Sequence, residues 1–154
     1  MPRLPRIRRL GFEAAFPVKS TSLIPVRYAE TDRMGVIHHS HYPVYFEQGR
    51  SDFFIEHLEP YSHFEEAGIL APVLELNLQL LGRATYGDVL TVTTRADWIK
   101  GLRLQMSYEV SVGSRAVARG STLHALVDRE LRPAHPRHFG SYFTSLRKVF
   151  PAPE

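Results

Sequence analysis

The sequence predicts an α+β domain in which a five-stranded antiparallel sheet wraps around one long central helix. The first observation is a set of four segments after residue 73 in which apolar and polar side chains alternate, which is typical of half-buried strands. The second is a segment from Tyr42 whose apolar residues recur with the helical period. A chain of 154 residues fits a single domain with one core.

The first strand is expected at Ser22 to Thr31, where Ile24, Val26 and Tyr28 form one apolar face. Pro25 lacks the N–H group that a sheet ladder needs. We therefore expect that this strand lies near an edge of the sheet or that the proline faces outward. A loop then leads to the helix.

The central helix is expected to begin near Tyr42 and to end before Pro60. Pro43 suits its first turn, where the missing N–H costs nothing, and Ser40 or His41 would cap it. A glycine on the packed face would let the helix approach the sheet closely. That face is rich in aromatic residues and consists of Tyr42, Tyr45, Phe46, Gly49, Phe53, Phe54 and His57.

A short second helix is expected at Ser62 to Ala67. Ser62 would cap this helix, Glu65 occupies the capping-box position, and Gly68 would end it. A last short helix is expected within Phe139 to Phe150.

The remaining strands follow the second helix. Turn signals at residues 86–88, 100–101 and 113–114 separate them, and such short connections predict a four-stranded antiparallel meander. In each strand one face should be more buried than the other. The expected strands are Leu74–Leu80, Leu90–Trp98, Leu104–Val112 and Val117–Val127.

The chain divides into three parts. Residues 1–20 are expected to form a poorly ordered basic extension, residues 21–136 the folded domain, and residues 137–154 a C-terminal segment. One helix cannot cover both faces of a five-stranded sheet, and one edge strand is left open. We therefore expect a homodimer or a homotetramer built as a dimer of dimers.

Composition excludes several classes of function. The chain has no cysteine, which excludes disulfides, thiolate metal sites and a cysteine nucleophile. The first 20 residues carry a net charge of +4, so the rest of the chain sums to −1, unlike the basic domain of a nucleic-acid binder. No apolar run is long enough to span a bilayer or to form a secretory signal. A cytoplasmic location is expected.

The segment from Val26 to Arg50 holds the candidate chemistry. Asp32 is followed by a tight turn at Gly35 and then by the start of the central helix. Helix N-terminal N–H groups can stabilise an oxyanion, and a nearby carboxylate can attack an acyl carbon or activate water. A lone aspartate in a loop is otherwise most often a turn residue or a helix cap.

Two other residue groups offer side chains that could carry chemistry. His38, His39 and His41 suggest a metal site, but no further ligand follows at a metal-binding spacing, so capping or surface roles are favoured. Glu47 is the runner-up carboxylate for a general base. Serine nucleophile elbows and phosphate-binding glycine loops are absent.

These residues resemble the hotdog-fold acyl-CoA thioesterases, in particular the 4-hydroxybenzoyl-CoA thioesterase-like branch that includes the short-chain acyl-CoA thioesterases of the bacterial Tol-Pal gene cluster. The likeness covers about residues 22–135. It rests on the motif from Tyr28 to Tyr42, on its continuation from Phe46 to Arg50, and on the turn from Leu81 to Asp88.

The resemblance implies an acyl-CoA thioester hydrolase that needs no cofactor, since coenzyme A is part of the substrate. It implies that Asp32 is the catalytic aspartate and that the His39 backbone N–H polarises the thioester carbonyl. Substrate contacts are expected from residues of the motif and from three basic side chains that would meet the phosphates of coenzyme A. The expected contacts are Tyr28, Gly35, His38, Tyr42, Glu47, Arg83, Lys100 and Arg103.

The chain departs from the family pattern at several positions. Met34 and Ser40 alter the expected shape of the acyl pocket, and Gly49 replaces the usual alanine. Residues 100–103 replace the family's usual serine with bulkier groups.

Two alternative functions remain open. One is a non-catalytic protein that binds acyl-CoA or an acyl carrier, and the other is a hotdog dehydratase with His39 and Glu47 as its catalytic pair. An interaction module with a basic tail is a third and weaker class.

Overall fold

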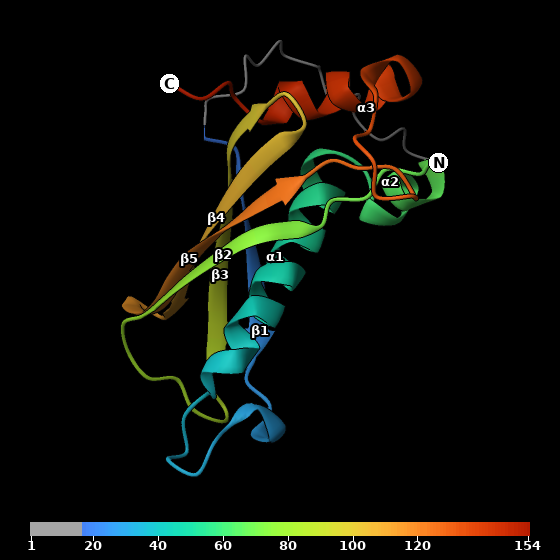
Figure 1. Ribbon diagram of the computed structural model, residues 1–154. Coiled ribbons are helices and arrows are strands. Elements are labelled where there is room, and N and C mark those ends of the chain that lie inside the picture. Colours follow the sequence, from blue (N-terminus) through green and yellow to red (C-terminus); the bar gives the residue numbers. More distant parts are fainter. Residues whose placement is uncertain (1–16) are drawn as a thin grey trace, which may run out of the picture.

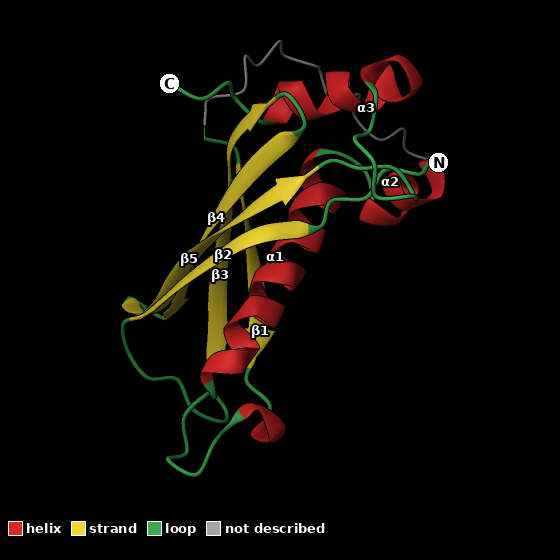
Figure 2. Ribbon diagram, viewed as in Figure 1, coloured by secondary structure: helices red, strands yellow, loops and turns green. Residues whose placement is uncertain are grey.

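The structure is a computed structural model that describes residues 17–154. The predicted basic extension lies almost entirely outside these described residues. Figures 1 and 2 show a twisted sheet with one long helix lying along it and two shorter helices gathered at one end. The elements are β1 (Lys19–Pro25), α1 (Tyr42–His57), α2 (Tyr61–Ala67), β2 (Val73–Leu80), β3 (Val89–Lys100), β4 (Arg103–Val112), β5 (Arg115–Ala125) and α3 (Pro136–Val149).

The sheet has five antiparallel strands in the order β1-β3-β4-β5-β2. The predicted α+β class and five-stranded sheet are confirmed, but the four-stranded meander is wrong. Only β3, β4 and β5 form a meander, because β2 pairs with β5 at the far edge. Residues 81–88 make no hairpin, since they pair instead with the loop before α1 through Ile37 N–H to Ala84 O, at 2.9 Å, and a bridge between Val36 and Thr85.

The helix α1 packs mainly against β1 and β3 with its predicted aromatic face. Phe46 and Phe53 are fully buried there, and Phe46 stacks on Tyr108 of β4 with ring centroids 4.3 Å apart. Gly49 permits the predicted close approach. A Cβ at this position would overlap the Thr94 hydroxyl oxygen on β3.

Two strands differ from their predicted form. The first strand runs over Lys19–Pro25 rather than Ser22 to Thr31, and residues Tyr28–Glu30 form a 3₁₀ turn because the ladder to β3 stops at Pro25. Its edge position is confirmed. In β3 a bulge between Ala96 and Trp98 moves Trp98 off the inner face and places Ile99 there instead.

The short elements also differ in detail. The helix α2 has Pro60 rather than Ser62 at its cap position and no side-chain cap, while Gly68 ends it with a left-handed φ of 94°, as predicted. The C-terminal helix α3 is longer than expected, and the last strand ends at Ala125.

The strand β2 is the least covered element of the sheet. Leu76 and Leu80 lie opposite the buried Thr122 and Ala118 of β5, so they are on the inner face of the sheet. Even so, Leu74, Leu76 and Leu80 remain 48%, 42% and 55% exposed. The alternation that predicts a buried face is therefore present in the sequence, but this chain alone does not bury it.

Candidate active site

A tight loop, residues 31–37, carries Asp32 and is called the Asp32 loop. A bridge joins Thr31 to Ile37, and the Asp32 N–H donates to the Val36 carbonyl at 2.9 Å. Gly35 turns the chain with a φ of 76° and donates its N–H to the Asp32 carbonyl at 2.9 Å. Because φ is positive there, glycine suits this turn better than any residue with a side chain.

The Asp32 carboxylate is half-buried beside this turn. One of its oxygens, Oδ1, accepts a hydrogen bond from the Met34 N–H at 2.8 Å. The other oxygen, Oδ2, has no hydrogen-bond partner within residues 17–154, so it is accessible to a water molecule or a substrate. The Asp32 side chain lines a cavity of about 150 Å³, called the loop cavity.

The start of α1 lies at the same cavity. A 3₁₀ turn over His39–His41 leads directly into α1, and the His38 ring caps it by accepting from the Ser40 N–H at 3.2 Å. His41 donates its N–H to the His38 carbonyl at 3.0 Å, whereas the described part of the chain offers no acceptor to the His39 N–H. This free donor sits at the positive end of the helix dipole.

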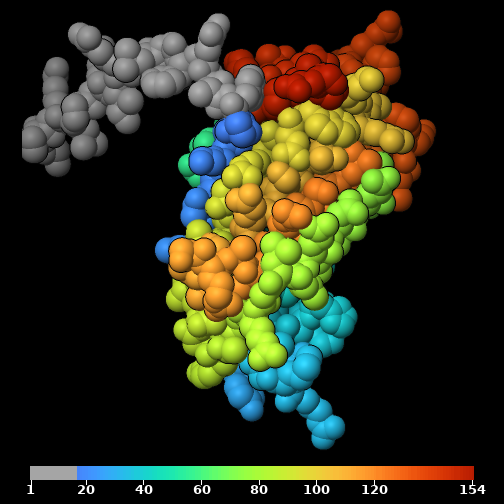
Figure 3. Space-filling model, turned by 90° about the vertical axis from the view of Figure 1, so that its left-hand side faces the viewer, coloured from blue at the N-terminus to red at the C-terminus, as the bar shows by residue number. Residues whose placement is uncertain are grey.

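The structure brings together four of the sequence-predicted site residues. Asp32, His39, Tyr42 and Arg83 all line the loop cavity, which the end of β2 and residues 82–84 close from the other side. Tyr42 is 2% exposed, and burial raises the pKa of its hydroxyl. In Figure 3 the loop cavity region is at the lower end of the molecule, where the light-blue Asp32 loop lies beside the green end of β2.

Other predicted residues lie apart from the loop cavity. Tyr28 is 76% exposed and packs edge-on against Tyr86, with ring centroids 5.7 Å apart. Lys100 ends β3 and Arg103 begins β4, and the two residues lie opposite each other in the strand register. The β3–β4 turn between them is at the end of β3 opposite to the Asp32 loop. Within one chain these two basic side chains and Asp32 do not share a site.

Sequence reasoning missed Glu30, which is 4% exposed. Its carboxylate accepts hydrogen bonds from the Tyr45 hydroxyl at 2.5 Å and from Arg27 Nε at 2.8 Å. Burial raises the pKa of Glu30, but these two donors outweigh burial and leave its pKa below the ordinary value. The only local signal was Arg27 three residues before Glu30, since Tyr45 lies much farther along the chain.

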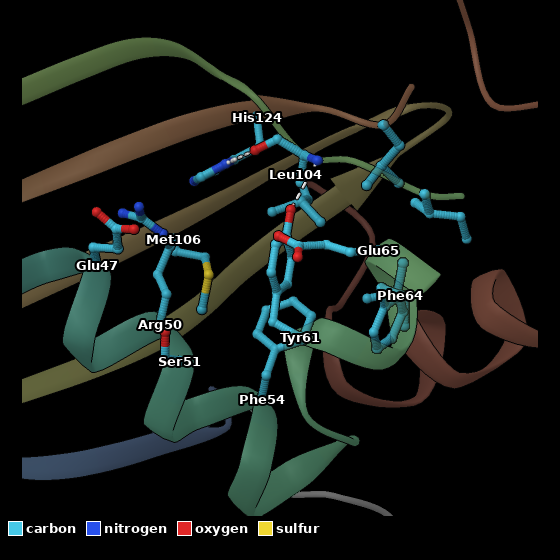
Figure 4. Close-up of a pocket in the computed structure, with 14 residues that line it drawn as sticks. Glu47, Arg50, Ser51, Phe54, Tyr61, Phe64, Glu65, Leu104, Met106 and His124 are labelled. Atoms are coloured by element: carbon cyan, nitrogen blue, oxygen red, sulfur yellow. Dashed lines mark hydrogen bonds between the residues drawn. The ribbon is translucent and has the colours of Figure 1, made fainter. Parts of the chain in front are cut away.

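A second cavity, of about 190 Å³, lies between α1, α2 and strands β4 and β5, and we call it the helix cavity. Figure 4 shows Glu47 and Arg50 together at one end and Phe64 at the other. Glu47, the runner-up carboxylate, therefore lines this cavity and not the loop cavity.

A chain of hydrogen bonds connects Arg50 and His124, two residues that line the helix cavity. The Ala71 carbonyl can only accept, so the His124 Nδ1 atom, 2.9 Å away, carries the proton. Nε2 of His124 then accepts from the Thr122 hydroxyl at 2.8 Å, Thr122 accepts from Tyr108 at 2.6 Å, and Tyr108 accepts from Arg50 at 3.2 Å.

The histidine at the end of this chain is neutral. His124 is 3% exposed, and burial, aided by the positive charge of Arg50, lowers its pKa to about 4. A protonated ring could no longer accept from Thr122. The arrangement is therefore a structural polar network rather than a proton-transfer site at neutral pH.

Two further findings concern metals and membranes. Within residues 17–154, no three His, Asp or Glu side chains are grouped so as to hold a metal ion. His38 caps the 3₁₀ turn before α1, and its ring lies tilted by 32° against that of His39, with ring centroids 4.0 Å apart. No helix among the described residues is long and apolar enough to cross a bilayer.

Known proteins resemble this chain in sequence and in structure. YneP of Bacillus subtilis, to which an acyl-CoA thioesterase activity is provisionally ascribed, is 32% identical over 108 residues, which cover 70% of this chain and 78% of YneP. The DHNA-CoA thioesterase of Staphylococcus aureus superposes with a TM-score of 0.80 at 30% identity, over 85% of this chain and 90% of that one. The hypothetical protein TT1821 of Thermus thermophilus gives a TM-score of 0.78 at 36% identity, over 86% and 98%.

The family model described as the Thioesterase-like superfamily matches residues 26–154, which include α1, the whole meander and α3. The observed sheet with α1 lying on it is the hotdog fold of these relatives. On these grounds the chain belongs to the thioesterase-like superfamily of hotdog-fold thioester hydrolases.

Proposed function

We propose that this protein hydrolyses acyl-CoA thioesters in the loop cavity, with Asp32 as the catalytic carboxylate and the His39 N–H as the oxyanion donor. The observation that carries the proposal is that two residues, Asp32 and His39, line the same cavity. Among the described residues, one carboxylate oxygen of Asp32 has no partner and the N–H of His39 has no acceptor. An electrophile placed between them would meet both groups.

In the reaction, the thioester oxygen accepts from the His39 N–H as negative charge develops on it, and the α1 dipole favours that charge. Acting as a base, Asp32 removes a proton from water while the hydroxide adds to the acyl carbon. The carbon–sulfur bond then breaks, and the coenzyme A thiolate takes the proton from Asp32. Acting as a nucleophile, Asp32 instead attacks the acyl carbon and expels the coenzyme A thiolate, which forms an acyl anhydride. Water then hydrolyses the anhydride to the free acid, restores the Asp32 carboxylate and supplies the proton that the thiolate takes up.

Substrate contacts follow from the same geometry. Arg83 lines the loop cavity and is our candidate for the coenzyme A phosphates. Lys100 and Arg103 can serve this role only when they come from another copy, because they lie at the other end of β3. We propose a homodimer, for which the exposed leucines of β2 offer an apolar edge.

The first experiment removes the carboxylate. Asp32→Ala and Asp32→Asn should lower kcat for acyl-CoA hydrolysis by about 10²- to 10⁴-fold, measured as thiol release over short-chain, long-chain and aromatic acyl-CoAs. Asp52→Asn is the matched control, since Asp52 is also half-buried but pairs with Gln48 on α1 at 2.9 Å. Wild-type rates in Asp32→Ala, or binding without hydrolysis across the panel, would refute the proposal.

The second experiment removes only the oxyanion donor. Proline lacks the N–H, and residue 39 tolerates proline because His38 before it is extended, with φ −66° and ψ 137°. His39→Pro should lower kcat by about 10²- to 10³-fold, while His39→Ala, which keeps the N–H, should stay near wild type. Equal losses in both variants would instead assign the role to the imidazole ring.

A further inference from the structure

The proposed chemistry leaves a buried carboxylate beside the site unused. Glu30 lies two residues before Asp32 and is 4% exposed. Burying a carboxylate costs free energy unless hydrogen bonds compensate for the lost water. The partners of Glu30 therefore indicate what its burial achieves.

The side chain of Glu30 joins two elements. Oε2 accepts from the hydroxyl of Tyr45, a 3% exposed residue in the first turns of α1, and Oε1 accepts from Arg27 Nε. The segment just before Asp32 is thus tied directly to the helix whose N-terminus supplies the oxyanion donor.

The backbone of the same residue closes the base of the Asp32 loop. The Glu30 carbonyl accepts from the His38 N–H at 2.9 Å, next to the bridge between Thr31 and Ile37. His38 immediately precedes His39. Glu30 is therefore connected to both parts of the proposed site. It precedes Asp32 by two residues in the chain, and it binds His38 and Tyr45 on the side of the oxyanion donor.

We infer that Glu30 is a positioning residue that holds the Asp32 carboxylate at its working distance from the His39 N–H, an inference that rests on the proposed function. Glu30 does not touch the substrate itself, because each of its oxygens already binds a donor and it does not line the loop cavity. Displacements of about 1 Å at such a site can cost about a hundredfold in rate.

The test separates positioning from a general contribution to folding. Glu30→Gln removes the charge but keeps the shape, and Tyr45→Phe removes one donor but leaves the Arg27 contact. Each should lower kcat by about tenfold to a hundredfold and leave KM within about twofold, at temperatures where the variant is folded by circular dichroism. The Kd for a non-hydrolysable thioether analogue of acyl-CoA should not change. Unchanged kcat in both variants would overturn the inference, and Tyr45→Phe decides it if Glu30→Gln does not fold.

A matched control uses another glutamate paired with arginine. The exposed Glu109 binds the half-buried Arg95 at 3.1 Å, and neither residue lines the loop cavity, so Glu109→Gln should keep wild-type kcat. A kcat loss in Glu109→Gln as large as that in Glu30→Gln would show that any such pair matters, and would overturn the inference.

The second arm asks whether Glu30 acts through Asp32. In an Asp32→Ala background, Glu30→Gln should leave the residual turnover unchanged, because no carboxylate remains to be positioned. A further loss by the same factor as in the wild-type background would overturn the inference. Wild-type turnover in Asp32→Ala alone would refute the proposed function instead, so the two failures are distinguishable.

Discussion

At the N-terminal end of α1, Tyr45 donates to a buried carboxylate that stays charged, whereas farther along the helix Arg50 begins a chain of hydrogen bonds that ends on a buried histidine that stays neutral. Glu30 has two donors, one of them cationic, and its pKa lies below the ordinary value. His124 has one acceptor and one donor, and its pKa lies well below its ordinary value of 6.5.

The different charge states of Glu30 and His124 indicate different roles for the two networks. A charged group persists in the interior only where donors surround it, and the structure provides such donors beside the Asp32 loop. Away from the loop, the buried His124 is neutral, and its ring joins β5 to the chain before β2 by donating to the Ala71 carbonyl. The charged cluster borders the proposed site, and the neutral one supports the core.

Among the effects on the free energy of unfolding, the largest is expected from His124, which should destabilise the folded protein in acid. The unfolded chain protonates this ring near pH 6.5 and the folded chain only near pH 4, so the unfolded state binds more protons between these values. The free energy of unfolding should thus be unaffected by His124 above pH 6.5 and should fall by about 3 kcal/mol as the pH drops to 4. Urea titrations of wild type and His124→Leu would isolate this contribution, and equal pH dependence in both would contradict it.

A somewhat smaller effect on stability is expected at Gly49, between the two networks on α1. A Cβ at Gly49, which lies on α1 between Tyr45 and Arg50, would overlap the Thr94 hydroxyl and stand 3.2 Å from a Val92 methyl. Gly49→Ala should therefore lower the free energy of unfolding by about 2 to 3 kcal/mol. Gly140→Ala on α3 is the control, because its Cβ would meet nothing within 4 Å, and it should be neutral or stabilising by up to about 1 kcal/mol. Similar denaturation midpoints for the two variants would argue against tight packing at Gly49.

The smallest effect concerns the charged cluster alone. Tyr45→Phe removes one donor to Glu30 and should lower the free energy of unfolding by about 1.5 kcal/mol at neutral pH. Because the pKa of folded Glu30 is below its ordinary value of 4.5, this stabilisation exists above pH 4.5 and is lost as the pH falls through the folded pKa. The difference between wild type and Tyr45→Phe should narrow in acid. A difference that stays constant down to acid pH would show that Tyr45 does not act through the charge of Glu30.

Much of the fold could be predicted because its signals are local. The aromatic face of α1 was confirmed nearly residue by residue, since helical periodicity is visible within one segment. The meander prediction was wrong at β2 because a turn signal shows that the chain bends, but not which strand it pairs with afterwards. Residues 81–88 bend as expected and then bind the Asp32 loop rather than closing a hairpin.

The candidate site shows the same division. Asp32, Gly35 and the start of α1 lie within a few residues of each other, so their sequence order already predicts a carboxylate beside a helix N-terminus. Glu30 was missed because its burial depends on Tyr45, and the neutral state of His124 depends on Ala71, Thr122 and Arg50. Lys100 and Arg103 were expected near the substrate, although they lie at the end of β3 away from Asp32.

The amino-acid sequence by itself determined the class of the fold, the long helix, the strand segments and the loop that carries Asp32, because each follows from the order of neighbouring residues. Only the tertiary structure decided the strand order, the exposed edge of β2, the cavity shared by Asp32 and His39, and the fact that Glu30 is charged while His124 is neutral. These properties depend on contacts between segments that are distant along the chain, and burial and hydrogen-bond partners are set by those contacts.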